Sequence, residues 1–323
     1  MGQKNLRIYG CGGAGINLTT TFALETSESP VYAVVNPVFV DTSLSNLDSN
    51  ISKDQCFILP DVDGSGKVRR ENHRAISESV KGLLSTHEPL DFNIVVFSGS
   101  GGSGSVIGPL IARELLDKEV PFICIVVGST ESVITCENTL NTLKSLDAIS
   151  KRAELPITIF YRGNDGDTKR STVDKSIKDT IVRLMALTSG NNAELDSRDI
   201  STWLYYNRHS DVSPQISELS IIDNSTIVEG VNDPISIASL LNDPDTPLPQ
   251  AGADYHCTGY IKGGKKETLP DMHFIISTSG IKHAYESLTE TRERYLKAAK
   301  KRNTGRNDLV SADDEVGDDD LVL

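Results

Sequence analysis

The chain has 323 residues, which is enough for one large domain or two modest ones. Its formal net charge of −13 argues against non-specific binding to nucleic acid, because such binding needs a basic surface. No apolar run reaches the roughly 18 residues that cross a membrane and no secretory leader is present, so we expect a soluble, cytoplasmic protein. Five cysteines without a CxxC pair predict reduced thiols rather than a disulfide or zinc framework.

Apolar strand candidates alternate with helical stretches over the first 190 residues. We expect strands at residues 6–9, 31–35, 56–59, 94–97, 122–127 and 157–161, and helices at 16–24, 73–85, 107–116, 136–152 and 173–188. This alternation predicts an α/β fold, with a doubly wound, mostly parallel sheet and helices on both faces. Ligands of such sheets bind beyond the carboxyl ends of the strands.

The composition changes near residue 189, where proline and aspartate become frequent. Short strands at 216–222, 255–261 and 272–277 predict a smaller α+β domain, and a helix at 281–302 ends in a basic segment. Six acids then fall within residues 313–320. We therefore expect a nucleotide-binding domain (1–172), a central helix (173–190), the α+β domain (191–280), and a C-terminal helix with an acidic tail (281–323).

Two glycine-rich segments follow expected strands. Residues 10–15 (GCGGAG) come after strand 6–9, and residues 98–105 (SGSGGSGS) come after strand 94–97. Glycines let backbone N–H groups approach a phosphate closely, and the N-terminus of the following helix adds a favourable dipole. Two such loops indicate a nucleotide whose phosphates are held from two sides.

The first loop alone also fits the dinucleotide pattern GxGxxG, through Gly10, Gly12 and Gly15. An NAD-dependent oxidoreductase should carry an acid at the end of the next strand to bind the ribose. The expected strand 31–35 is followed by Asn36 and Pro37, and the nearest acid, Asp41, lies well past it, which disfavours this alternative. No lysine follows the second loop, so it is not a Walker P-loop.

The second loop closely resembles the GGGTGSG phosphate loop of the tubulin/FtsZ superfamily, and the first resembles the superfamily's GxGGxGxN loop. Ser100, Ser103 and Val106 depart from the usual glycine, threonine and glycine. The resemblance implies that GTP or GDP is bound mainly by backbone N–H groups. The implied contacts are Cys11, Gly12, Gly13, Ala14, Gly15, Asn17, Gly101, Gly102, Ser103, Gly104 and Ser105.

The same resemblance implies the base and metal contacts. Residues 161–165 resemble the turn whose asparagine, here Asn164, contacts the base; Asp174 stands where an acid reads guanine, and Glu137 is a candidate ribose contact. Mg²⁺ is expected to be held mainly by the nucleotide, without a protein metal site. Residues 61–67 fall where the superfamily has its γ-phosphate-sensing loop. The same segment matches five positions of an EF-hand loop, at Asp61, Asp63, Ser65, Gly66 and Val68, but Asn72 stands in place of the last glutamate, which disfavours calcium binding.

An acidic segment follows the expected central helix and resembles the superfamily's NxDxx(D/E) motif. By this match Asp199 is the catalytic acid, Asp196 is the first motif acid, and Glu194 replaces the usual asparagine. The motif implies that these acids serve the nucleotide of the next subunit in a filament. The alternative is a solvated turn in which Asp199 caps a helix that starts near Ile200.

The resemblance covers about residues 5–205, and the C-terminal helix with its acidic tail resembles the phage-encoded PhuZ branch. It implies a GTPase that polymerises into longitudinal homopolymers, with the tail bound to a neighbouring subunit. It further implies that the filament positions phage or plasmid DNA in the bacterial cytoplasm, without direct nucleic-acid or membrane binding. A filament protein that binds nucleotide without hydrolysis stays open, because Glu194 and Ser100 depart from the motifs.

Overall fold

The structure is a computed structural model. It describes residues 2–24, 29–59, 73–166, 168–223, 225–228, 230–262 and 269–304. The expected γ-phosphate loop (61–67) and the acidic tail lie outside the described residues. No helix among the described residues is long and apolar enough to span a bilayer.

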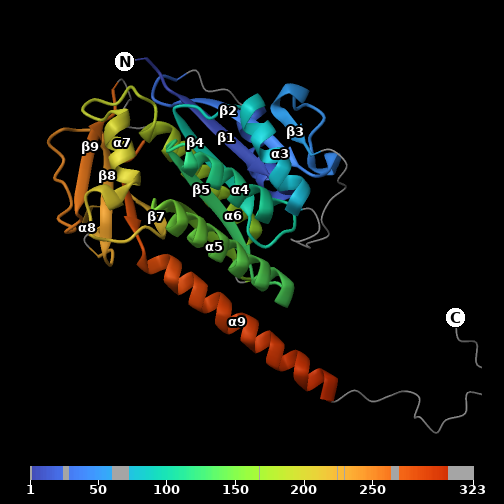
Figure 1. The fold of residues 1–323 in the computed structure, drawn as a ribbon. Helices are drawn as coiled ribbons and strands as arrows, with labels where there is room; N and C mark the ends of the chain where they lie inside the picture. The colour runs from blue at the N-terminus through green and yellow to red at the C-terminus, as the bar shows by residue number, and fades with distance from the viewer. Residues whose placement is uncertain are drawn as a thin grey trace, which may run out of the picture.

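The described strands form one sheet in the order β3-β2-β1-β4-β5-β6-β7-β10-β8-β9 (Figure 1). The strands are β1 Asn5–Cys11, β2 Val34–Asp41, β3 Cys56–Ile58, β4 Phe92–Ser98, β5 Phe122–Ser129, β6 Ile157–Asn164, β7 Ile216–Ile222, β8 Pro234–Leu241, β9 Tyr255–Tyr260 and β10 Met272–Ser277. The α-helices are α1 Gly12–Thr19, α2 Thr21–Leu24, α3 His73–Thr86, α4 Gly104–Asp117, α5 Val133–Ala153, α6 Arg170–Leu187, α7 Ser197–Leu204, α8 Ser225–Val228 and α9 Ser279–Thr304.

The sheet is mostly parallel, as the alternation of strands and helices predicts. The first seven strands in the sheet order, from β3 at the edge to β7, are parallel to one another. β10 lies between β7 and β8 and is antiparallel to both. β6 pairs directly with β7, so the strands of the C-terminal region extend the same sheet. The four-part division of the chain stays a prediction.

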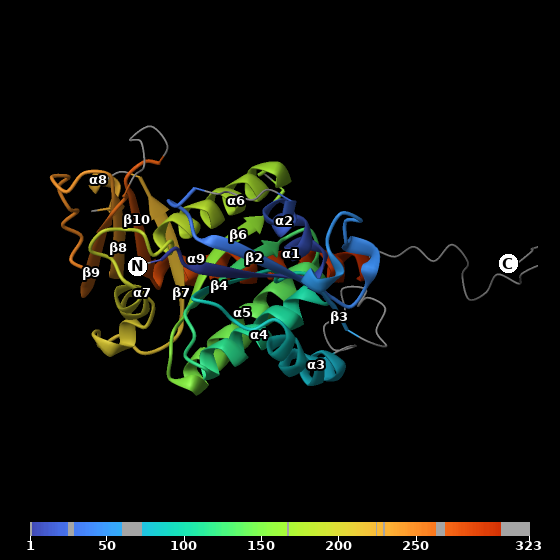
Figure 2. The same cartoon turned by 90° about the horizontal axis from the view of Figure 1, so that it is seen from above.

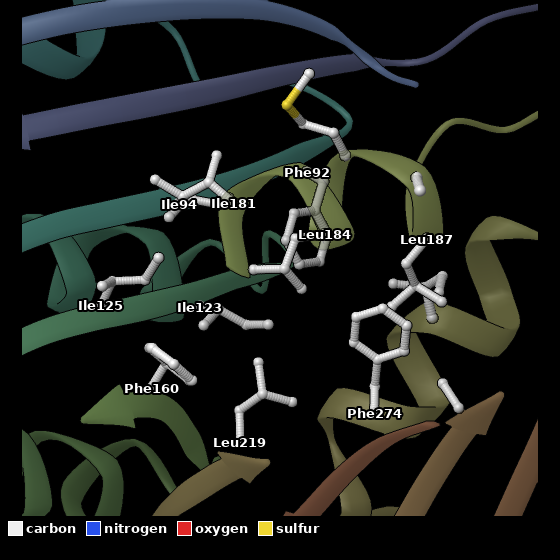
Figure 3. Packing of buried hydrophobic residues seen from close by; sticks show 14 of the residues in the cluster. Phe92, Ile94, Ile123, Ile125, Phe160, Ile181, Leu184, Leu187, Leu219 and Phe274 are labelled. Atoms are coloured by element: carbon white, nitrogen blue, oxygen red, sulfur yellow. The ribbon is translucent and has the colours of Figure 1, made fainter. Parts of the chain in front are cut away.

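Helices cover both faces of the parallel part of the sheet. α1 and α6 lie on one face, and α3, α4 and α5 lie on the other (Figure 2). The central strands are buried on both faces, which explains why β4 reads as an almost continuous apolar run. Figure 3 shows one half of this core, where Ile181, Leu184 and Leu187 of α6 pack among strand residues such as Ile94 and Ile123.

The position of β2 differs from the expected strand at 31–35, because the observed strand begins at Val34 and ends at Asp41. Asn36 and Pro37 therefore lie inside the strand. Proline cannot donate a hydrogen bond to a neighbouring strand. Pro37 is tolerated because it has a neighbouring strand on one side only: it pairs with Ile8 of β1, and β3 pairs with β2 only from Phe39 onward. The sequence-based end of this strand was wrong.

Two helices begin earlier than expected, inside the glycine-rich segments. α1 starts at Gly12 rather than Ile16, and α4 starts at Gly104 rather than Ile107. The loops are therefore short, and their last glycines form the first turns of the two helices.

Candidate nucleotide site and acidic motif

A cavity of about 750 Å³ lies at the carboxyl ends of β1, β2, β4, β5 and β6, where the parallel sheet predicts a ligand. It holds most of the residues that the two glycine motifs predict. Its lining includes Cys11, Gly12, Gly13, Ala14, Asn17, Asp41, Ser43, Ser45, Asn46, Ser98, Ser100, Gly101, Gly102, Ser103, Gly104, Ser129, Glu131, Thr135, Asn164, Arg170, Asp174 and Lys178.

The two glycine loops touch each other at the floor of this cavity. Gly12 has a φ of +67°, and a Cβ atom added there would lie 2.8 Å from the backbone nitrogen of Gly104. A Cβ atom on Gly104 would in turn lie 2.7 Å from the carbonyl oxygen of Cys11. Both positions therefore require glycine, for the backbone conformation at Gly12 and for the close approach at both.

The starts of α1 and α4 are not capped by side chains. Neither Cys11, the N-cap of α1, nor Ser103, the N-cap of α4, makes a side-chain capping hydrogen bond. The first N–H groups of a helix have no partner within the helix, and the helix dipole favours an anion beside them. Two such helix starts at one cavity provide donors for phosphate groups.

One wall of the cavity follows β2 and was missed by sequence reasoning. Asp41 is buried, and its carboxylate accepts hydrogen bonds from Thr42 N at 2.7 Å and from Asn46 Nδ2 at 2.9 Å. Burial raises the pKa of Asp41 above its ordinary value, although these two bonds lower it in part. The hydroxyls of Thr42 and Ser103 lie 2.7 Å apart and join this wall to the second glycine loop.

The opposite wall contains the expected base-reading residues. Asn164 is the last residue of β6, and its side-chain oxygen is buried without a hydrogen-bond partner within the described part of the chain. Asp174 lies between Arg170 and Lys178 at four-residue spacing on α6, so the three share one helix face. Arg170 also forms an ion pair with Glu131.

Three predicted contact residues do not line the cavity. Gly15 packs against β4, because a Cβ atom there would lie 2.2 Å from the carbonyl oxygen of Val96. The buried hydroxyl of Ser105 donates back to the carbonyl oxygens of its own loop. Glu137 faces α9 instead and accepts hydrogen bonds from Nε and Nη2 of Arg292, at 2.9 and 2.6 Å.

The acidic motif forms the start of α7. Asp196, rather than Asp199, is the N-cap: it accepts hydrogen bonds from the N–H groups of Arg198 at 2.7 Å and Asp199 at 3.0 Å. These bonds hold the pKa of Asp196 below its ordinary value. Asp199 completes the capping box by accepting from Asp196 N at 2.9 Å, and it also accepts from the hydroxyl of Tyr255 at 3.2 Å.

This motif stands at the edge of the sheet opposite the cavity. Lys4 N, just before β1, donates to Ser189 O just after α6, and Asp196 lines a small hollow with Lys4 and Phe92 at the amino ends of β1 and β4. α6 has 18 residues and spans about 27 Å between the two edges. The acids of one chain therefore cannot reach that chain's own cavity.

No group of three or more potential metal ligands occurs among the described residues. Asp41 lines the cavity, and its two carboxylate oxygens already accept hydrogen bonds from the protein. This donor set is compatible with a metal ion held mainly by a bound nucleotide.

Comparison with known proteins identifies the class of this fold and site. Residues 5–159 match the Tubulin/FtsZ family, GTPase domain, and residues 195–281 match the phage tubulin-like protein, C-terminal domain. The phage tubulin-like protein of Pseudomonas phage PhiPA3 is 30% identical over a 325-residue alignment that covers 100% of both chains.

Solved structures give the same result. The protofilament of TubZ from bacteriophage PhiKZ superposes with a TM-score of 0.86 at 30% identity, covering 98% of this chain and 99% of that one. The phage tubulin PhuZ solved with GDP also gives a TM-score of 0.86, at 27% identity and with the same coverage. The chain belongs to the tubulin/FtsZ family and, within it, to the phage tubulin-like proteins.

Proposed function

We propose that the cavity binds GTP and GDP with Mg²⁺ and that filaments of this chain hydrolyse the GTP. The observation that carries the proposal is the pair of uncapped helix starts that meet at Gly12 and Gly104. Their contact leaves no room for side chains, so the backbone donors of both loops face one bound group. The match to the Tubulin/FtsZ GTPase domain and the GDP-bound relative support the same ligand.

The base-side wall favours guanine over adenine. The Asp174 carboxylate provides acceptors for the N1–H and N2–H₂ donors of guanine, whereas adenine would place an acceptor against it. The buried, unpartnered oxygen of Asn164 is a further acceptor for which a ligand would supply the donor. Arg170, Asp174 and Lys178 all come from α6, so this helix would connect the base site to the acidic edge.

Hydrolysis is proposed to occur between subunits. Head-to-tail stacking would place the acidic edge of one subunit over the cavity of the next. The acids of one chain cannot reach that chain's own cavity, so a neighbouring subunit would have to supply them. Asp199 would then polarise the attacking water, with Asp196 beside it and Glu194 at the start of the motif. Mg²⁺ bound with the nucleotide would offset phosphate charge.

The relatives support self-association, and the cellular role is part of the proposal. Two related phage proteins have structures described as a protofilament and a filament, which supports self-association of this chain into a longitudinal homopolymer. We propose that such a filament positions phage DNA in the cytoplasm of an infected bacterium, without direct contact to nucleic acid. The net charge of −13 agrees with an indirect role.

The test is competition for a labelled GTP analogue on dilute protein, combined with pelleting and electron microscopy. GTP and GDP should displace the label far better than ATP or NAD, GTP should produce filaments, and turnover per subunit should rise steeply with protein concentration. Equal displacement by ATP would exclude the guanine assignment. Preferential displacement by NAD would favour an oxidoreductase instead, and full turnover by dilute monomers would exclude catalysis between subunits.

A further inference from the structure

The loop between β5 and α5, residues 129–132, forms part of the cavity wall. Ser129 and Glu131 line the cavity, and Thr130 lies between them. Thr130 N donates to the carbonyl oxygen of Asn164 at 3.1 Å, so the loop is tied to the residue whose side chain faces the base site. A displacement of this loop would therefore change the shape of the base-side wall.

The distal half of α9 holds this loop from outside. The hydroxyl of Tyr295 donates to the carbonyl oxygen of Thr130 at 2.8 Å. One helical turn earlier, Arg292 binds Glu137 in the first part of α5. Residues three apart lie on the same face of a helix, so one face of α9 contacts both the loop and the start of α5.

The rest of α9 is anchored separately. Ile281 and Leu288 are buried in the core beside α5, and the ring of Tyr285 lies under Lys144, whose Nζ is 5.8 Å from the ring centroid. These contacts keep the proximal half of the helix in place whether or not Tyr295 binds the loop. Figure 1 shows α9 running along α5 and extending beyond it. A displacement of the distal half of α9 would therefore move the loop through the bond from Tyr295 to Thr130.

We propose that Tyr295, assisted by Arg292, positions the β5–α5 loop and thereby slows nucleotide release. The inference rests on the proposed function, because it assumes that the cavity holds a guanine nucleotide. The side chains of Arg292 and Glu137 are 36% and 38% exposed, so their ion pair contributes little by itself. The part-buried bond to the Thr130 carbonyl oxygen is the more effective link. Tyr295 is a positioning residue and touches no part of the cavity itself.

The experiment compares Tyr295→Phe with Tyr285→Phe, which removes a hydroxyl from the same helix at a ring that packs on Lys144 instead. Release of a fluorescent GDP analogue is measured from dilute protein, together with thermal unfolding. The loss of one hydrogen bond predicts release roughly threefold to tenfold faster in Tyr295→Phe, with release from Tyr285→Phe unchanged. The melting temperatures of both variants should match the parent protein, since both retain their rings.

Hydrogen exchange of the loop amides in nucleotide-free protein separates this inference from the proposed function. Tyr295→Phe should speed exchange at residues 130–132, and Tyr285→Phe should not. If the parent protein binds GDP but both variants release it at the parental rate, the inference is overturned. If the parent protein fails to bind guanine nucleotides, the proposed function fails, while faster exchange in Tyr295→Phe still supports the link between α9 and the loop. Unchanged exchange at residues 130–132 in Tyr295→Phe would overturn the inference.

Discussion

The helices that begin at the two edges of the sheet differ in how their N-termini are capped. At the cavity edge, α1 and α4 begin with glycine-rich turns, and no side chain caps either helix. At the opposite edge, α7 begins with a capping box in which Asp196 and Asp199 bind each other's backbone N–H groups. One edge leaves donors available for a ligand, whereas the other satisfies its donors with its own carboxylates.

Within one chain the acidic motif has a structural role, as the capping box of α7. Asp196 and Asp199 stabilise the start of α7 through hydrogen bonds to backbone N–H groups, and the Tyr255 hydroxyl also donates to Asp199. A chemical role for the same carboxylates requires a second subunit, because α6 separates them from their own cavity. Variants that keep the capping geometry but remove charge can therefore separate the structural from the chemical role.

The largest effect is expected for Asp199→Asn. An asparagine oxygen can still accept a hydrogen bond from Asp196 N, so α7 should start normally, while the charge that polarises water is lost. We expect GTP binding and filament assembly to persist, with hydrolysis slower by about two orders of magnitude or more and filaments correspondingly long-lived. Phosphate release from assembled protein measures this, with the melting temperature as the control for folding.

A smaller but still large effect is expected at the cavity edge for Gly12→Ala. The φ of +67° disfavours alanine, and the added Cβ would press on the backbone nitrogen of Gly104. Strain of this kind amounts to about 1–2 kcal/mol, which predicts GTP affinity weaker by roughly fivefold to thirtyfold. Gly82→Ala in α3 is the control, because a Cβ atom there would meet nothing within 4 Å and Gly82 does not line the cavity. Equal affinities of the two variants would contradict the loop contact.

A third prediction concerns the acidic tail, residues 313–323, which lies outside the described residues. Its acids alternate with Val316, Leu321 and other apolar residues, so it could bind a neighbour through both charge and apolar contacts. Deleting the tail should raise the critical concentration for assembly by roughly fivefold or more, with GTP affinity of the monomer unchanged.

Replacing Lys297, Lys300 and Lys301 of α9 by glutamate should have an effect similar to the deletion, because these residues belong to the basic end of the helix. An electrostatic contact also weakens in high salt, so the difference from the full chain should shrink along a salt series. Assembly of the truncated protein at the parental threshold in every salt would show that the tail is a solvated appendage.

Much of the fold could be predicted because apolar runs and glycine loops follow elementary rules. The sequence analysis did not predict β8, because both faces of this strand are buried and its residues do not alternate between apolar and polar. Its polar residues are paired instead through tertiary contacts: Ser236 donates to Trp203 O, and Ser239 binds His256 and His273. These partners are distant in sequence, so no local pattern reveals them.

The glycine loops of the candidate site could be predicted from the sequence, because their backbone geometry requires glycine. The positions of the acidic side chains around the cavity were harder to predict. Gly12 and Gly104 were found because close backbone approach permits only glycine. The sequence predicts a strand at 31–35 and so places Asp41 beyond it, whereas Asp41 is the last residue of β2. The argument against an NAD site that used the position of Asp41 was therefore wrong. The family match, rather than that argument, supports the GTPase class. Glu137 was assigned to the ribose by position along the motif, yet it binds Arg292 of α9.

The smallest expected effect tests Glu194, the residue that departs from the superfamily motif. Glu194 has a φ of +62°, in the left-handed region that glutamate disfavours and asparagine tolerates. The backbone therefore explains why asparagine suits this position. Glu194→Asn should raise the free energy of unfolding by about 0.5–1 kcal/mol.

Glu154→Asn is the matched control, because Glu154 has a similar φ of +55° at the end of α5, where the chain has no motif acid. Both substitutions should stabilise the protein by a similar amount in denaturant titrations, since both relieve the same backbone strain. Hydrolysis should stay within about threefold of the parent protein in both, if Glu194 contributes position rather than charge. A loss beyond tenfold in Glu194→Asn alone would instead assign its carboxylate a direct part in the neighbouring subunit's cavity, and the acidic edge would then supply three chemical groups rather than two.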